Sequence, residues 1–110
     1  MTNGGTDQDI LIGAQRWAKG GQGVALATVI ATWGSAPRPV GAQMAVNDTG
    51  AMIGSVSGGC IEGAVVEAAI NTIGSGKHQL MEFGVSDDEA WAVGLACGGR
   101  IQILVEKVGP

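Results

Sequence analysis

Two cysteines, each next to a pair of glycines, are the residues of this chain best suited to chemistry. Cys60 lies within GGCIE at 58–62, and Cys97 opens CGGR at 97–100. Glycine allows backbone angles closed to other residues and lets a ligand approach the main chain. A thiolate in such a loop binds a soft metal or carries sulfur. Packing alone gives little reason to place both thiols beside glycine pairs.

Cys60 stands where a helix is expected to begin, after an apolar strand and a glycine-rich loop. The partial positive charge and N–H groups of a helix N-terminus favour a thiolate over a thiol and attract anions. One interpretation of Cys60 is therefore an activated thiolate. The other is a small buried residue, since free cysteine is among the most buried residue types. Position alone leaves both open.

Glu62 and Arg38 are the charged residues that would accompany the thiols. On a helix, Glu62 falls on the apolar stripe with Val65 and Ala69. Its carboxylate therefore either faces a ligand or interacts favourably with the helix dipole at the N-terminus. Arg38 lies between two prolines, where its guanidinium either forks onto a phosphate or carboxylate or is solvated. Two cysteines and one histidine cannot make a four-ligand zinc site without carboxylates, so no structural zinc is expected.

Composition excludes several classes of function. The net charge of −4 and the pI near 4.6 argue against binding to nucleic acid or to an anionic membrane. Residues 54–59 match neither a dinucleotide fingerprint nor a phosphate-binding loop with its lysine.

No signal peptide or apolar run of ~20 residues is visible, so a cytoplasmic location with reduced thiols is expected. Only 15% of residues are charged, which predicts a homodimer or an obligate partner.

The hydrophobic pattern predicts one α+β domain over residues 1–110, with about residues 1–8 flexible. We expect a mixed β-sheet of about five strands with two main helices and one short helix. The helices are expected at 7–19, with Leu11 on the apolar face, at 60–73, ended by Gly74 or Gly76, and after a capping box at 86–89. The strands are expected at 23–33, 42–47, 51–56, 78–84 and 100–106. A hairpin turn is expected at 48–50, and the last strand should place Ile101, Ile103 and Val105 on one face. A right-handed crossover is expected over 51–84, and the loops at 34–41, 54–60 and 94–99 should converge on one cleft.

Four motifs occur in order along the chain: TWGSAPRPVG at 32–41, GSVSGGCIEG at 54–63, FGVSD at 83–87 and GLACGG at 94–99. Together they resemble the N-terminal domain of the xanthine dehydrogenase accessory factor (XdhC/CoxI) family, over about residues 12–107. Usual members of that family also carry a C-terminal Rossmann-like domain. The sequence shows no such domain, so we expect either that a separate Rossmann-like chain is a partner or that the full accessory role is absent.

The resemblance implies an accessory protein rather than an enzyme, although it does not decide the point. Such a protein binds molybdenum cofactor, aids its sulfuration by a cysteine desulfurase, and aids its insertion into a xanthine or carbon monoxide dehydrogenase-type molybdenum hydroxylase. Cys60, and less favourably Cys97, is the implied molybdenum ligand, and Arg38 with the helix N-terminus is suited to the phosphate. The implied cofactor-binding set is Ser35, Arg38, Ser57, Gly58, Gly59, Cys60, Glu62, Cys97, Gly98 and Gly99.

Two other functions stay open beside this one. The first is a sulfurtransferase that carries a persulfide on Cys60. The second is a structural half-domain that pairs with a separate Rossmann-like chain. Because Cys60 opens a helix whereas Cys97 precedes a strand, Cys60 is expected to be the more reactive thiol.

Overall fold

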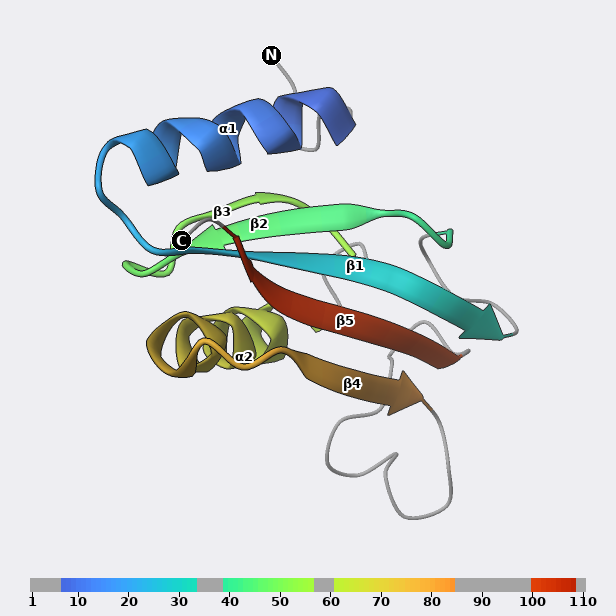
Figure 1. Ribbon diagram of the computed structural model, residues 1–110. Helices are drawn as coiled ribbons and strands as arrows, with labels where there is room; N and C mark the ends of the chain where they lie inside the picture. Colours follow the sequence, from blue (N-terminus) through green and yellow to red (C-terminus); the bar gives the residue numbers. More distant parts are fainter. Residues whose placement is uncertain (1–6, 34–38, 57–60, 85–99, 109–110) are drawn as a thin grey trace.

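A computed structural model describes residues 7–33, 39–56, 61–84 and 100–108, which form two helices and one sheet of five strands (Figure 1). The elements in chain order are α1 (Asp7–Lys19), β1 (Val24–Trp33), β2 (Gln43–Asn47), β3 (Met52–Gly54), α2 (Glu62–Ser75), β4 (Gln79–Gly84) and β5 (Arg100–Val108). The strand order across the sheet is β3-β2-β1-β5-β4. Helix α1 packs on one face, over β1, β2 and β3, and α2 packs on the other, over β1, β2 and β5.

The expected mixed sheet is wrong for the described residues. Every neighbouring pair of strands is antiparallel, and two helices are present in these ranges. Strands β3 and β4 do run in the same direction, but they form opposite edges of the sheet instead of lying near each other. The reason is that β5 occupies the place between β1 and β4. The short helix expected after 86–89 falls outside the described residues.

The limits of individual elements follow local chemistry. Helix α2 ends where a glycine was expected to stop it: Gly76 has a φ of 75°, and its N–H donates to the carbonyl of Thr72 at 2.8 Å. This left-handed C-cap is a conformation that glycine adopts without penalty. Neither described helix is long and apolar enough to span a bilayer.

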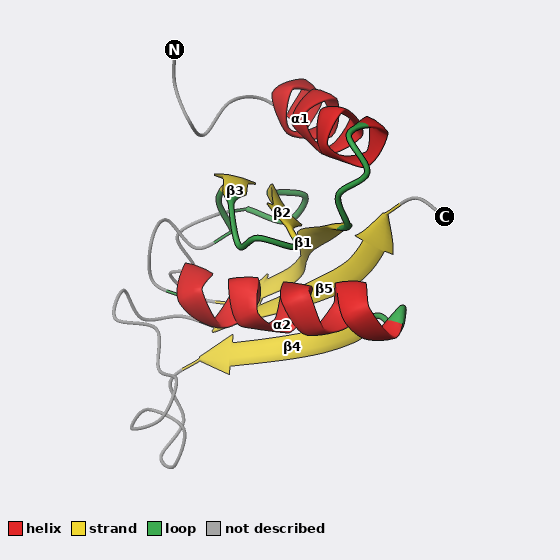
Figure 2. Cartoon of the chain, turned by 90° about the vertical axis from the view of Figure 1, so that its left-hand side faces the viewer, coloured by secondary structure: helices red, strands yellow, loops and turns green. Residues whose placement is uncertain are grey.

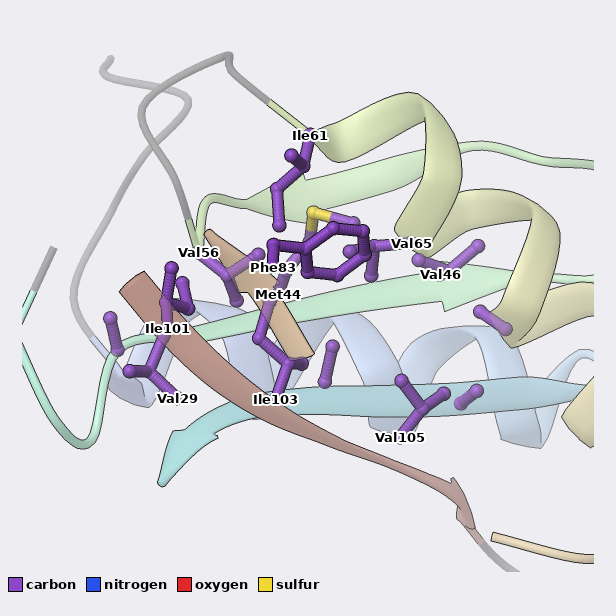
Figure 3. Packing of buried hydrophobic residues seen from close by; sticks show 14 residues of the cluster. Val29, Met44, Val46, Val56, Ile61, Val65, Phe83, Ile101, Ile103 and Val105 are labelled. Carbon is purple, nitrogen blue, oxygen red and sulfur yellow. The ribbon is translucent and has the colours of Figure 1, made fainter. Parts of the chain in front are cut away.

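The main core lies between the sheet and α2. Ile101, Ile103 and Val105 of β5 alternate onto this face, as predicted, and are fully buried. They pack with Met44 of β2 and Phe83 of β4 beneath the helix (Figure 3). This face therefore holds β5 and β4 against the strands that precede α2 in the sequence.

A smaller core lies under α1. Ile10 and Ala14 are buried there against Val24 and Ala45. Leu11, which the helical periodicity also placed on the inner face, is instead 48% exposed. The contact stripe of α1 is thus narrower than its apolar pattern, since among the described strands the helix packs over β1, β2 and β3, with Val108 at the end of β5 joining its core.

We expect Asn47→Ala to lower the free energy of unfolding by about 2 kcal/mol, because it removes the acceptor of two backbone hydrogen bonds that contribute about 0.5–1.5 kcal/mol each. Asn47 is 3% exposed, and its Oδ1 accepts from the N–H of Thr49 at 3.0 Å and of Ala51 at 2.9 Å. The predicted hairpin turn at 48–50 is built on these bonds. Urea unfolding gives the measurement, and Asn47→Asp, which keeps the acceptors, should lose less. Equal losses for both variants would contradict this role for Oδ1.

Candidate functional site

Glu62 is the one predicted site residue that falls within the described ranges. The others lie outside them: Ser35, Arg38, Ser57, Gly58, Gly59, Cys60, Cys97, Gly98 and Gly99. The site is therefore built from Glu62 and from the described residues that flank the loops bearing this set.

The carboxylate of Glu62 is buried at the first turn of α2, with 7% of the residue exposed. Its Oε2 accepts a hydrogen bond from the hydroxyl of Ser55 at 2.7 Å and another from the N–H of Val56 at 3.1 Å. The prediction that Glu62 lies on the inner stripe of the helix with Val65 and Ala69 is confirmed. Its carboxylate ties the end of β3 to the start of α2.

The two residues that bracket 57–60 are both buried in the main core. Val56 is 0% exposed and Ile61 is 5% exposed, and both belong to the cluster around Phe83. Figure 3 shows both side chains turned toward that ring from opposite ends of the bracketed segment. Cys60 directly precedes Ile61 in the sequence, and the side chain of Ile61 is anchored in the core.

Gly54 makes the exit from β3 possible. Its φ is 88°, and a Cβ built there would lie 2.6 Å from the carbonyl oxygen of Gln43 and 2.7 Å from Cδ1 of Ile10. A side chain has no room in this position, and a positive φ is strained for all residues but glycine. The close approach lets the chain leave β3 between β2 and α1 and place Ser55 beside Glu62.

Described residues that flank the predicted loops at 34–41 and 94–99 meet at one end of the sheet. Trp33, at the end of β1, and Gly84, at the end of β4, both pair with Arg100, the first residue of β5. Strand β3 runs parallel to β1 toward this end but stops at Gly54, which is level with Ala27 in the middle of β1. Figure 2 shows the first turn of α2 and the tip of β4 on this same side. The cleft itself involves residues outside the described ranges and stays a prediction.

Arg100 has structural partners at this end of the sheet. Its guanidinium lies 2.8 Å from the carboxylate of Glu82 and 4.9 Å from the centre of the Trp33 ring. An exposed ion pair of this kind stabilises weakly, and the cation–π contact adds to it. Arg100 thus links the ends of β1, β5 and β4, a role that its place after the Cys97 motif did not reveal.

Within the described ranges, no group of three or more His, Cys, Asp or Glu residues is placed to hold a metal ion. Glu62 engages Ser55 and Val56, so its position suits the support of a loop better than the ligation of a metal. Sequence reasoning missed Ser55 as a site residue. Its signal was a small polar side chain directly after the end of β3, seven residues ahead of a carboxylate on the inner face of a helix.

Comparison with known proteins gives the family. Residues 17–84 match the model of the XdhC and CoxI family, which is more than half of the chain. This chain belongs to that family. The matched segment contains the TWGSAPRPVG and GSVSGGCIEG motifs, with Arg38, Cys60 and Glu62, and it ends before Cys97.

Several relatives in this family are much longer. The molybdenum cofactor insertion chaperone PaoD of Escherichia coli (strain K12) is 38% identical over 89 residues, which is 80% of this chain and 27% of PaoD. A probable xanthine dehydrogenase subunit from Bacillus subtilis (strain 168) is 34% identical over 86 residues, or 76% of this chain and 26% of the relative. This chain therefore spans about a quarter of the length of these two relatives.

A solved structure shares the fold. The crystal structure of a xanthine dehydrogenase from Bacillus halodurans superposes with a TM-score of 0.73 and 31% sequence identity. The match covers 92% of this chain and 30% of that one.

Proposed function

We propose that this chain is an accessory domain for a molybdenum hydroxylase, which binds molybdenum cofactor and aids its sulfuration and insertion into the enzyme. The family and the PaoD relative support the accessory role. A client of the xanthine or carbon monoxide dehydrogenase type, a cysteine desulfurase, and a separate Rossmann-like chain are the proposed partners. No turnover of a metabolite is part of this proposal.

The observation that carries the proposal is the anchoring of the segment before α2. Val56 and Ile61 hold its two ends in the core, and Glu62 bonds across it to Ser55 and Val56. Cys60 directly precedes Ile61 in the sequence, inside the part of the chain that matches the family. A binding residue needs support of this kind, since a thiol on a loose loop loses conformational freedom each time it engages a ligand.

Bound molybdenum cofactor supplies a metal that accepts thiolate sulfur, together with a pterin and a terminal phosphate. In this proposal Cys60 holds the metal or its sulfur, and Cys97 is the weaker candidate. The phosphate would be held by Arg38 and by the N-terminus of α2. Serine hydroxyls and glycine N–H groups at 35, 57–59 and 98–99 would contact the rest of the molecule.

We expect Cys60→Ala to weaken the retention of molybdenum cofactor by about 1–3 kcal/mol, the scale of one lost charge-assisted contact, and to leave folding nearly unchanged. Cofactor extracted without oxygen from a molybdenum hydroxylase serves as the probe. Its retention on gel filtration is measured by molybdenum content and by pterin fluorescence after oxidation. Cys97→Ala is the matched control and should lose less.

Equal retention by Cys60→Ala and the parent would remove Cys60 from the site and leave Arg38 and the loop amides as the anchor. The sulfurtransferase alternative is separated by intact-mass analysis after incubation with a cysteine desulfurase and cysteine. A gain of one sulfur atom that disappears in Cys60→Ala would favour a persulfide carrier. An unchanged mass, together with the loss of retention, would favour the binding role.

A further inference from the structure

Strand β4 forms one edge of the sheet, and none of the described strands pairs with its outer side. An edge strand presents a row of backbone N–H and C=O groups that can pair with another strand, and proteins guard such edges with short strands, prolines and bulges. The opposite edge, β3, has three residues. Strand β4 has six, without a proline, in regular register with β5. The β4 edge therefore carries none of these three protections.

The side chains of β4 alternate between the core and an open face. Met81 and Phe83 pack into the main core on the α2 side. Leu80 lies on the opposite face beside Leu104 of β5 and is 58% exposed. Helix α1 does not cover this part of the sheet, because it packs over β1, β2 and β3 (Figure 1). A leucine at the open edge gains from burial against a partner strand.

The sequence of β4 complements itself in one antiparallel register. When two copies pair about a twofold axis through Leu80, the two leucines lie opposite each other, and His78 lies opposite Glu82 of the second copy. Leu80 and Glu82 are exposed and share one face of β4 by alternation, and His78, also exposed, directly precedes the strand. The carboxylate of Glu82 also contacts Arg100 of its own chain at 2.8 Å. Apolar pairs and pairs of complementary polar groups stabilise facing strands. A shift of two residues either way sets Leu80 against Glu82 or against His78 and loses both pairs.

We propose that a second copy of this chain pairs with β4 in this register, so that one sheet runs through both copies. The helices leave room for it. Helix α2 packs over β5, β1 and β2, so the two copies of α2 are separated by at least three strand spacings, ~14 Å. Packed helices lie ~8–10 Å apart, so the two do not collide. The proposal does not depend on cofactor binding by Cys60.

The interface is a single pair of strands, so the dimer forms in a concentration-dependent way. Its buried area is smaller than the roughly 1,200 Å² at which stable interfaces begin. Light scattering of the parent chain over a range of concentrations should show a rise in mass toward a dimer. Leu80→Lys should remain monomeric throughout, with its thermal unfolding unchanged because Leu80 is exposed.

Cross-linking tests the register directly. In a background with Cys60→Ser and Cys97→Ser, Leu80→Cys should form a covalent dimer on mild oxidation or with a short bis-maleimide. Met52→Cys on β3, 50% exposed, is the matched control and should stay monomeric. A mixture of His78→Cys and Glu82→Cys chains should give the mixed dimer in excess over either homodimer. Equal cross-linking at positions 52 and 80, or a parent chain that is monomeric at every concentration, would overturn the proposal.

Discussion

Gly54→Ala is expected to lower the free energy of unfolding by about 3 kcal/mol, because it combines two penalties. A non-glycine residue at a left-handed φ costs roughly 1–2 kcal/mol, and forcing a methyl group into packed surroundings costs roughly 1–3 kcal/mol. The φ at this position is 88°, and the new Cβ would lie 2.6 Å from a backbone oxygen of Gln43, which cannot move away as a side chain can. A loss of this size is a large part of the ~5–15 kcal/mol that holds a typical domain together.

The matched control is Gly74→Ala in α2. A Cβ there meets nothing within 4 Å, and the residue lies in a helix. Alanine should therefore stabilise the chain by about 0.5–1 kcal/mol. Urea unfolding of both variants gives the two changes, which should have opposite signs. If Gly54→Ala unfolds at the same urea concentration as the parent, the close approach of β3 to β2 and α1 does not exist in solution.

Glu62→Ala should lower the free energy of unfolding by about 2–4 kcal/mol. It removes a charged acceptor and leaves the N–H of Val56 without that partner, while Val56 is itself 0% exposed. Hydrogen bonds to charged groups contribute about 1.5–3 kcal/mol, and a buried orphaned donor adds about 1–3 kcal/mol. Faster hydrogen exchange at the Val56 amide and faster alkylation of Cys60 should accompany the loss.

Glu67→Ala is the control for this variant. Glu67 lies on the same helix with its side chain on the exposed face, so its truncation should change stability by less than about 0.5 kcal/mol. Glu62→Gln should fall between the two, because its amide oxygen can accept one bond but carries no charge. If Glu62→Ala is as stable as Glu67→Ala, the carboxylate does not hold the segment before α2.

Local signals predicted the elements well because their causes lie within a few residues. The turn at 48–50, the glycine that ends α2 and the alternation of Ile101, Ile103 and Val105 all depend on near neighbours in the chain. The order of the strands does not. The sequence of β5 does not indicate that this strand pairs with β1 on one side and with β4 on the other. The strand order could therefore not be predicted, and the expected mixed sheet was wrong.

The site was predicted unevenly for the same reason. The helical period placed Glu62 on the inner face, as the structure confirms. The helical period suggested a ligand or the helix dipole as the partner of the Glu62 carboxylate. Its actual partners, Ser55 and Val56, lie before a loop, and helical periodicity gives no information about contacts across a loop. The larger part of the predicted set, from Ser35 to Gly99, stays a prediction.

The central place of β5 bears on how this domain folds. Val24 near the start of the chain pairs with Val108 near its end, so the sheet closes through contacts between distant parts of the sequence. Folds dominated by such contacts form slowly, since the entropy of loop closure is lost before the contacts are gained. During synthesis, β1 and β4 lack a shared neighbour until residues 100–108 have left the ribosome. The segment that matches the family, residues 17–84, should therefore not fold as an autonomous unit.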